Sequence, residues 1–335
     1  MLSLLAWAYE KVVKLRNRLY DKGVFEVHDL GARTISIGNL TTGGTGKTPL
    51  VAYVADLLAE RGEKVCILTR GYGRNDAHKR VLVSNGENVL VDASAGGDEP
   101  VELAQKLLGK AVIIADADRV AAAEWAKRKF GITAFVLDDG FQHRKAKRDV
   151  DIVCIDATDP FGGGKMLPAG RLREPAEGLK RANIVLITRA DQIEDLAKLT
   201  AEILKLAPSA DVLEGRNAIT AIRGITSGSE INPAEVGKAF AFCGLGSPDN
   251  FFSLLRKNAI EVAGSLAFRD HYVYLQRDIE RIEAAASEAG ADSLVTTAKD
   301  AVKLAEHRFT LPCYVIEIGM EINDPARFVA RITSF

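Results

Sequence analysis

The chain has 335 residues and a formal net charge of −1, and 47% of its residues are hydrophobic while 27% are charged. This length suggests two domains, and the composition is that of a globular protein with substantial cores. The near-zero charge gives no global electrostatic argument for nucleic-acid binding, and no run of about 18 apolar residues predicts a membrane-spanning helix. The cysteines lie far apart, which favours reduced, buried thiols in a cytosolic protein over disulfides or zinc.

The N-terminal residues 2–20 fit an amphipathic helix. Apolar side chains share one side, Lys11, Lys14 and Arg18 lie on the other, and Arg16 interrupts the apolar face. A basic amphipathic helix can lie in a membrane interface, and it can equally pack on its own domain. The residues alone leave both alternatives open.

A glycine-rich turn follows an apolar, strand-like run at 35–40 and precedes an apolar-periodic helix. Strand, glycine-rich loop and helix in this order are the context of a phosphate-binding loop, because backbone N–H groups and the helix N-terminus converge on an anion. The alternative is a plain turn whose Lys-Thr pair begins a helix. We expect Lys47 to reach the outer phosphates of a nucleotide and the Thr48 hydroxyl to bind Mg²⁺. The predicted nucleotide-binding residues are Thr41, Thr42, Gly43, Gly44, Thr45, Gly46, Lys47 and Thr48.

Strand-like runs then alternate with helical patterns up to about residue 215. The expected strands are 64–70, 111–115, 134–139, 150–155 and 183–188, and the expected helices are 98–107 and 119–130. Asn85-Gly86 predicts a hairpin of 81–84 with 88–92, outside the main sheet. The alternation predicts a doubly wound, mostly parallel sheet of the P-loop NTPase type, whose ligands gather at the carboxyl ends of the strands.

The pattern restarts at about Arg216. Strands are expected at 239–243, 293–297 and 314–318, with helices around 248–258, 276–289 and 324–333. We interpret this part as a second, smaller α/β domain. The predicted division is therefore an N-terminal helix at 1–24, a P-loop domain at 25–215 and the smaller domain at 216–335, closing the active-site cleft.

Four acidic side chains follow the phosphate-binding loop at strand or helix ends. Asp138 and Asp139 end an apolar strand in a Walker-B-like arrangement, which suits Mg²⁺ binding directly or through water. Asp98 begins a helical pattern, so it is either an N-cap or a general base, and Glu99 beside it is a candidate metal ligand. His271 is a candidate base or base-orienting group, although a lone histidine is more often structural and this one must cross the cleft.

A glycine- and proline-rich connection at 161–175 is too long for a plain linker. Its Lys165, Arg171 and Arg173 suit anionic groups, or they form a solvated basic loop. Farther on, Thr188-Arg-Ala-Asp191 loosely echoes the element that reads guanine in GTP-binding proteins. The residues alone therefore leave the choice between ATP and GTP open.

Seven motifs in this order carry a family resemblance. They are Ile37-Gly-Asn-Leu with Gly43-Gly-Thr-Gly-Lys-Thr48, Leu68-Thr-Arg-Gly-Tyr72, Gly97-Asp-Glu-Pro100, Asp138-Asp-Gly-Phe-Gln-His-Arg144, Leu167-Pro-Ala-Gly-Arg-Leu-Arg-Glu-Pro175, Asp270-His-Tyr272 and Thr296-Thr-Ala-Lys-Asp300. Together they resemble the tetraacyldisaccharide 4′-kinase (lipid A 4′-kinase) family. The resemblance extends from the N-terminal helix to about Leu304.

The resemblance implies a Mg²⁺-dependent kinase that transfers the γ-phosphate of ATP to the 4′-hydroxyl of a tetraacylated glucosamine disaccharide 1-phosphate, giving lipid IVA. It also implies attachment to the cytoplasmic face of a bacterial inner membrane, which favours the interfacial alternative for residues 2–20. The family's aspartate and histidine base pair falls on Asp98 and His271. We expect no nucleic-acid partner and no obligate protein partner.

The acceptor is expected to meet Gln142 and His143, while Arg171 and Arg173 are candidates for its 1-phosphate or for the γ-phosphate. A different class of protein, a membrane-associated Walker-type ATPase switch, shares the loop, the acidic strand end and the amphipathic helix. Such a switch would use water as the phosphate acceptor. The large second part of the chain and the Leu-Pro-Ala-Gly-Arg connection argue against it.

Overall fold

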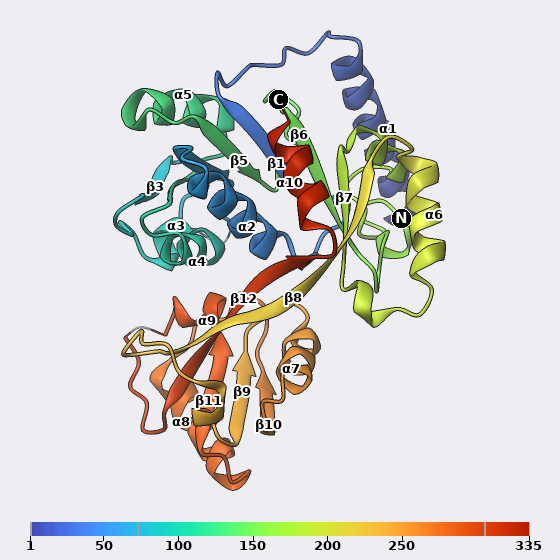
Figure 1. Cartoon of the computed structure of the whole chain (residues 1–335). Coiled ribbons are helices and arrows are strands. Elements are labelled where there is room, and N and C mark those ends of the chain that lie inside the picture. The colour runs from blue at the N-terminus through green and yellow to red at the C-terminus, as the bar shows by residue number, and fades with distance from the viewer. Residues whose placement is uncertain (1, 73, 305, 335) are drawn as a thin grey trace.

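The computed structural model describes residues 2–72, 74–304 and 306–334, which form two lobes around one sheet (Figure 1). The sheet has 12 strands in the order β10-β9-β11-β12-β8-β7-β6-β1-β5-β2-β4-β3. Their bounds are β1 Arg33–Asn39, β2 Val65–Thr69, β3 Val81–Asn85, β4 Ala111–Ala115, β5 Ala134–Asp138, β6 Val150–Asp156, β7 Ile184–Thr188, β8 Asp211–Gly224, β9 Ala239–Cys243, β10 Val262–Ala267, β11 Ser293–Thr297 and β12 Cys313–Ile322.

Helices cover both faces of this sheet. Their bounds are α1 Leu2–Asp21, α2 Lys47–Glu60, α3 Ala93–Gly96, α4 Asp98–Lys106, α5 Arg119–Phe130, α6 Leu196–Leu206, α7 Pro248–Lys257, α8 Gln276–Glu288, α9 Ala298–Ala301 and α10 Pro325–Thr333. In the first lobe, α2, α4 and α10 pack on one face, while α5, α6 and α1 pack on the other. In the second lobe, α7 and α8 belong to separate cores. The expected mostly parallel α/β fold is therefore confirmed.

The strand β1 lies in the middle of the first lobe, between β5 and β6, and is parallel to both. This arrangement brings the loop after β1 next to the acidic end of β5, because the register pairs Ile37 with Asp138. The strands β2, β4 and β7 extend the parallel sheet on either side. The carboxyl ends of all these strands therefore meet at one edge.

The expected turn after Asn85 is present, since the Asn85 and Leu90 N–H groups donate to the Asn88 and Val83 carbonyls, but its expected place outside the main sheet is wrong. The strand β3 joins the main sheet, antiparallel to β4, and only a single bridge from Ser84 to Val89 represents the second arm. Burial explains the difference. Val83 is fully buried against the first lobe's core, whereas Leu90 is 47% exposed, so the second arm pairs through its backbone without forming a full strand.

Two long strands connect the lobes. The strand β8 pairs with β7 in the first lobe and then runs antiparallel to β12, from Gly215 opposite Ile322 to Gly224 opposite Tyr314. The helix α10 returns to the first lobe, where Phe328 packs edge-on against Tyr53 of α2. The predicted boundary at residues 215 and 216 thus falls inside β8. The division into domains stays a prediction, and any boundary has to take into account that β8 and β12 both run from one lobe into the other.

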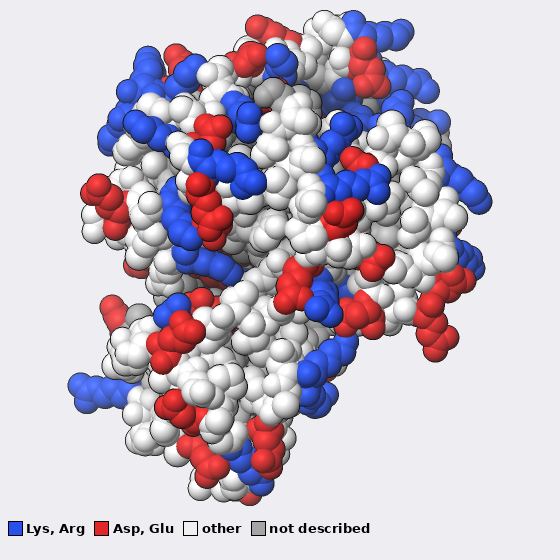
Figure 2. All heavy atoms as spheres, in the orientation of Figure 1, with Lys and Arg blue, Asp and Glu red and all other residues white. Residues whose placement is uncertain are grey.

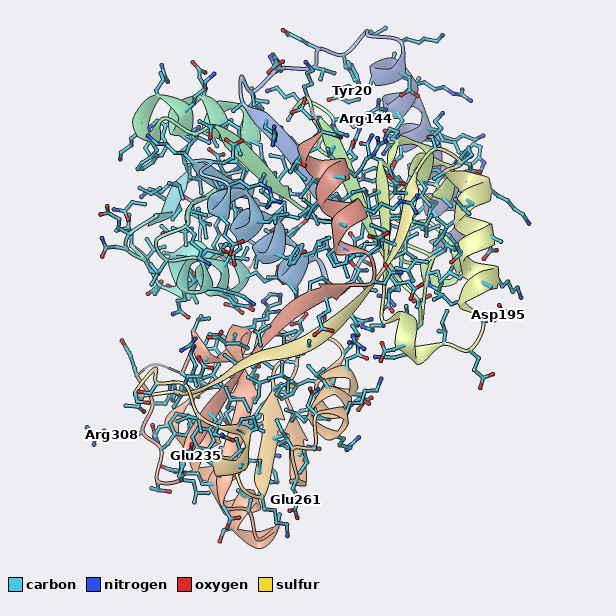
Figure 3. All side chains as sticks on the ribbon, viewed as in Figure 1. Tyr20, Arg144, Asp195, Glu235, Glu261 and Arg308 are labelled. Atoms are coloured by element: carbon cyan, nitrogen blue, oxygen red, sulfur yellow. The ribbon has the colours of Figure 1, made fainter. Side chains whose placement is uncertain are left out.

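The helix α1 has a packed face and an exposed apolar face. Ala6 and Val13 are buried, and the Tyr9 hydroxyl donates to the Arg173 carbonyl at 2.9 Å. At its end, the Arg144 guanidinium lies over the Tyr20 ring (Figure 3). Six large apolar side chains point away from the protein and are 51–69% exposed: Leu2, Leu4, Leu5, Trp7, Val12 and Leu15. None of the described helices is both long and apolar enough to cross a membrane.

Charged side chains of both signs are distributed over the two lobes. On the face shown in Figure 2, acidic and basic groups are interspersed, so this face presents no extended field of one sign. The distribution agrees with the net charge of −1. The electrostatic features that matter for the site are therefore local ones.

Candidate active site

The glycine-rich loop between β1 and α2 forms one wall of a cleft of about 930 Å³, and every loop residue from Thr41 to Thr48 lines it. Gly46 precedes α2 in a left-handed conformation with φ of 78°, and a Cβ there would lie 3.3 Å from the Thr188 side chain. Gly43 also has a positive φ, 115°. These conformations favour glycine and let the chain turn sharply into α2, so that the helix N-terminus faces the cleft.

Hydrogen bonds from neighbouring strands fix the loop. Asn39 Nδ2 donates to Thr45 Oγ1 at 2.8 Å, and Thr188 Oγ1 donates to the Thr45 carbonyl at 3.0 Å. Arg189 donates to the Gly44 carbonyl at 2.5 Å. The Thr188-Arg-Ala-Asp191 segment therefore braces the loop, and Asp191 itself forms an ion pair with Lys257 of the second lobe.

The opposite wall of the cleft comes from the second lobe. It includes one side of α7 along its length, part of β12 and the residues around His271. The lining residues from this lobe include Gly246, Ser247, Phe251, Leu254, Ile316 and Ile318. A ligand in the cleft would thus touch both lobes, with its charged end at the loop and an apolar part against α7 and β12.

The two acids at the end of β5 have different surroundings. Burial raises the pKa of Asp138 to about 6, with the charges of Glu99 and Asp139 adding to the effect. Its Oδ2 accepts a hydrogen bond from Thr69 at 2.8 Å. Burial also acts on Asp139, but bonds from Arg173 and the charge of Lys47 outweigh it and hold the Asp139 pKa at about 2.

Arg173 binds Asp139 through both ends of its guanidinium, at 2.6 and 2.8 Å. Lys47 Nζ lies 3.6 Å from the same carboxylate. Asp139 has a φ of 53°, a conformation that non-glycine residues rarely adopt and that clusters at functional sites. The predicted Lys47, Asp138, Asp139 and Arg173 thus form one charged group beside the loop.

Asp98 and His271 come together across the lobes. His271 Nδ1 lies 3.0 Å from Asp98 Oδ2, and this hydrogen bond raises the His271 pKa. Burial would raise the Asp98 pKa, but the bond from His271 and the charge of Lys303 lower it instead. The N-cap of α4 is Gly97, so Asp98 is the first helical residue and makes no capping bond.

The members of this pair face different surroundings. The side chain of His271 is 39% exposed and lines the cleft, whereas that of Asp98 is 13% exposed and lies behind it. Like Asp139, His271 has a strained positive φ, 57°. Glu99 lines the cleft and lies 3.8 Å from Lys299 of the second lobe.

A second hollow of about 300 Å³ adjoins the cleft beside α1. It contains Gln142, His143 and Arg173, and it shares Arg70, Tyr72, Asp139 and Arg173 with the cleft. Burial, with the nearby charge of Arg119, lowers the His143 pKa to about 4, so the imidazole is neutral at physiological pH. Arg171 lies elsewhere: it lines the nucleotide-sized cleft, binds Asp159 and donates twice to the Thr42 carbonyl.

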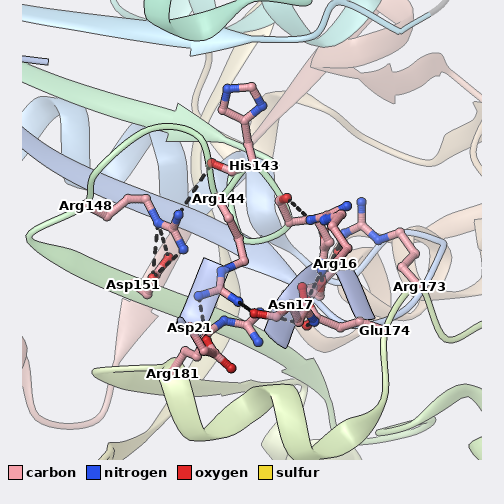
Figure 4. Close-up of polar contacts among 12 residues, drawn as sticks. Arg16, Asn17, Asp21, His143, Arg144, Arg148, Asp151, Arg173, Glu174 and Arg181 are labelled. Carbon is pink, nitrogen blue, oxygen red and sulfur yellow. Dashed lines mark hydrogen bonds and ion pairs between the residues drawn. The ribbon is translucent and has the colours of Figure 1, made fainter. Parts of the chain in front are cut away.

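A buried network joins α1 to this hollow (Figure 4). Glu174, 1% exposed, accepts from Gln142 at 2.8 Å, from Arg181 at 2.7 Å and from Asn17 of α1 at 3.2 Å. Gln142 also donates to the Asn39 carbonyl at 2.9 Å. The helix is therefore linked to the base of the phosphate-binding loop through side chains.

Sequence reasoning assigned no role to Arg119, Arg70, Tyr72 or Glu174, although the last three lie within motifs that carry the family resemblance. Arg119 is 6% exposed and lines the second hollow, and Arg70 and Tyr72 lie where the hollow meets the cleft. Arg119 follows the carboxyl end of β4, so the rule that located Asp138 and Arg70 at strand ends would have located it as well. Glu174 gave no comparable signal, because its partners are far apart in the sequence.

The sequence matches the family described as tetraacyldisaccharide-1-P 4′-kinase over residues 1–335. It is 40% identical over 329 residues to a tetraacyldisaccharide 4′-kinase of Geobacter metallireducens, covering 97% of this chain and 94% of that protein. Identity to the Halothermothrix orenii protein of the same name is 37% over 343 residues, covering 96% and 89%. A solved structure of LpxK from Aquifex aeolicus in complex with ATP superimposes with a TM-score of 0.79 at 30% identity, covering 98% of this chain and 96% of that one.

Proposed function

The chain belongs to the tetraacyldisaccharide-1-P 4′-kinase family, and on this premise we propose how its residues transfer a phosphate from ATP to the 4′-hydroxyl of the tetraacylated disaccharide 1-phosphate. One observation carries the proposal: the loop-lined cleft and the second hollow meet at Arg70, Tyr72, Asp139 and Arg173. A donor in the cleft and an acceptor in the hollow would bring their reacting ends together there. A nucleotide-driven switch is not favoured, because a water molecule as phosphate acceptor would not require a second hollow beside the cleft.

ATP would lie with its phosphates on residues 41–48 and Lys47 on the outer phosphates. The residues fit Mg²⁺, because the Thr48 hydroxyl and the carboxylates of Asp138, Asp139 and Glu99 line the same cleft and are the oxygen ligands that this ion prefers. Arg173 donates to both oxygens of Asp139, whereas the described residues donate only to Oδ2 of Asp138. Direct coordination therefore suits Asp138, and a water-mediated contact suits Asp139. The cation would neutralise charge on the phosphates.

The Asp98–His271 pair would accept the proton of the 4′-hydroxyl. The acceptor oxygen forms a bond to the γ-phosphorus while the bond to the leaving ADP oxygen breaks, and the proton passes to the pair. An alcohol is a weak acid, so this proton leaves during the transfer rather than before it. The contact between His271 and Asp98 across the lobes supports the assignment, with Asp98 as the carboxylate that holds the proton and His271 as the group beside the cleft.

The hollow would hold the disaccharide. Gln142 and neutral His143 suit sugar hydroxyls, while the buried Arg119 suits the anionic end of the acceptor. Arg173 binds Asp139 where the cleft and the hollow meet, so it would act near the reacting phosphate, and Arg171 would contact the nucleotide. Of the four residues expected to bind substrate, Gln142 and His143 thus belong to the hollow, Arg171 belongs to the cleft, and Arg173 lines both.

The exposed apolar face of α1 would seat the protein on the cytoplasmic face of the inner membrane. Its packed face borders the acceptor hollow, since Tyr9, Val13 and Asn17 line that hollow. The sequence left open whether this helix packs on its own lobe or lies in a membrane interface. Its two faces support both, because one packs on the first lobe and the other presents an apolar surface. An acylated acceptor could then keep its chains in the lipid while its sugar enters the hollow.

Incubation with γ-labelled ATP and detergent-dispersed tetraacyldisaccharide 1-phosphate tests the function. The proposal predicts label in the lipid fraction, one ADP per lipid phosphorylated, and loss of both in Lys47→Ala. Inorganic phosphate released at the same rate with and without acceptor, with no labelled lipid, would refute it.

A further inference from the structure

We propose that Lys303 is a positioning residue for the proton-accepting pair: its ammonium group, delivered from the second lobe, holds the Asp98 carboxylate in place. Lys303 follows α9 in a turn, and its side chain is only 7% exposed. Its Nζ lies 3.3 Å from Asp98 Oδ2, the oxygen that also faces His271 Nδ1 at 3.0 Å. This inference rests on the proposed function, because it concerns the same pair.

A buried aspartate determines where this ammonium lies. Asp300 is fully buried, and its Oδ2 accepts from the Gly244 N–H at 2.9 Å and from Thr297 Oγ1 at 2.8 Å. Its Oδ1 makes no hydrogen bond within the described residues and lies 3.1 Å from Lys303 Nζ. A buried charge requires an opposite charge, so Asp300 holds the ammonium, and the Tyr274 ring 5.7 Å away closes one side.

Two lysines of the second lobe form ion pairs with Asp98 and with the acidic side chains around it. Lys299, from the same segment, lies 2.9 Å from Asp270 and 3.8 Å from Glu99. Lys303 forms ion pairs with Asp98, at 3.3 Å, and with Asp300, at 3.1 Å. Glu102 of α4 also faces this cluster, and burial with the charge of Glu99 raises its pKa to about 7. Neighbouring acids on α4 therefore pair with different cations, and the one that contacts Asp98 is Lys303.

The consequence for catalysis is geometric. His271 and Lys303 both approach Oδ2, and none of the described residues donates a hydrogen bond to Oδ1. Two partners on one oxygen fix the rotation of the carboxylate and, through the bond to Nδ1, the orientation of the His271 imidazole beside the cleft. Loss of one partner would let the carboxylate turn, and a misplacement of about 1 Å at a reacting group can lower the rate by about 100-fold.

The test compares Lys303→Met and Lys303→Arg, each in the otherwise unchanged protein and in Asp98→Asn. We expect Lys303→Met to lower kcat by about 10- to 100-fold with less than a twofold change in the KM for ATP, and Lys303→Arg to restore most of kcat. In Asp98→Asn, the Lys303→Met change should lower kcat no further, because the group it positions is already lost.

Lys106→Met is the matched control. Lys106 lies on the same helix as Asp98 and also reaches the second lobe, through the Ile318 carbonyl at 2.5 Å, but it does not touch Asp98. Its removal should change kcat by less than about twofold and should be additive with Asp98→Asn.

An unchanged kcat in Lys303→Met, or an equal fall in both backgrounds, would overturn the inference. If Lys303→Met does not fold, Asp300→Asn combined with Lys303→Met removes both buried charges, and a normal kcat in that protein would also overturn it. Failure of the proposed function gives a different result, since the unsubstituted protein would then form no labelled lipid.

Discussion

Glu174→Gln offers a sharp test of the link between α1 and the active site. The substitution keeps the volume of the side chain and removes its charge. The carboxylate of Glu174 is 2% exposed, and its partner Arg181 is 14% exposed. Three side chains donate to Glu174, at 2.7 to 3.2 Å, and a glutamine side chain has only one oxygen to accept them. The guanidinium of Arg181 is left buried without its counter-charge.

Breaking a buried ion pair in this way costs about 3–5 kcal/mol. Because Gln retains one acceptor, we expect a loss of about 3 kcal/mol, which corresponds to a fall in Tm of roughly 4 °C for a chain of this size. Urea denaturation followed by circular dichroism measures the loss as a lower midpoint at constant slope. Hydrogen exchange at residues 16–20 should rise as well, since Asn17 loses its acceptor.

Glu124→Gln is the control for this experiment. Glu124 pairs with Arg128 at 3.7 Å, but both side chains are about two-thirds exposed or more. Removal of such a surface pair should cost no more than about 0.5 kcal/mol. A loss below about 1 kcal/mol in Glu174→Gln, or one equal to the control, would refute the reasoning that this carboxylate joins α1 to the hollow.

Three further predictions follow from the site and from α1. Asp98→Asn should lower kcat at least about 100-fold while the dissociation constant for ATP stays within about twofold, and an unchanged kcat with chemistry rate-limiting would reject Asp98 as part of the base. His143 resists protonation in the folded state, with a pKa near 4, while the unfolded chain takes up a proton at about pH 6.5. The free energy of unfolding should therefore fall as the pH drops from about 6.5 to about 4, by on the order of 3 kcal/mol from this group, and His143→Gln should remove that part of the slope. Leu4→Glu with Leu15→Glu should reduce co-sedimentation with phosphatidylethanolamine–phosphatidylglycerol vesicles, whereas Leu204→Glu on α6 should not; equal binding by all three proteins would contradict the role of α1.

The first lobe and its loop could be predicted because their signals are local. The parallel strands β2, β4, β5 and β7 are short, fully buried runs of mostly apolar residues, and the residue after each lies at the carboxyl edge of the sheet. That rule brought Lys47, Asp138 and Asp139 together without any knowledge of contacts. The conformation of the loop also follows from its glycines, since Gly43 and Gly46 adopt positive φ values.

The connection between the lobes could not be predicted in this way. The strand β8 has a mixed pattern of buried, half-buried and exposed residues, and its long partner β12 is about a hundred residues farther along the chain, as the pairing of Gly215 with Ile322 shows. The strand β10 is half-exposed and shifts register at Gly264, so its periodicity is weak. Lys303 gave no signal either, because its role depends on two carboxylates from different lobes.

The position of the transferred phosphate tests the central claim most directly. The lipid product of a reaction with ATP and tetraacyldisaccharide 1-phosphate would be isolated and analysed by phosphorus–proton correlation NMR. The account predicts a new phosphomonoester whose phosphorus couples to the proton at carbon 4′, with the 1-phosphate unchanged. A phosphate at any other position, or a product identical to the starting lipid while ATP is consumed, would contradict it.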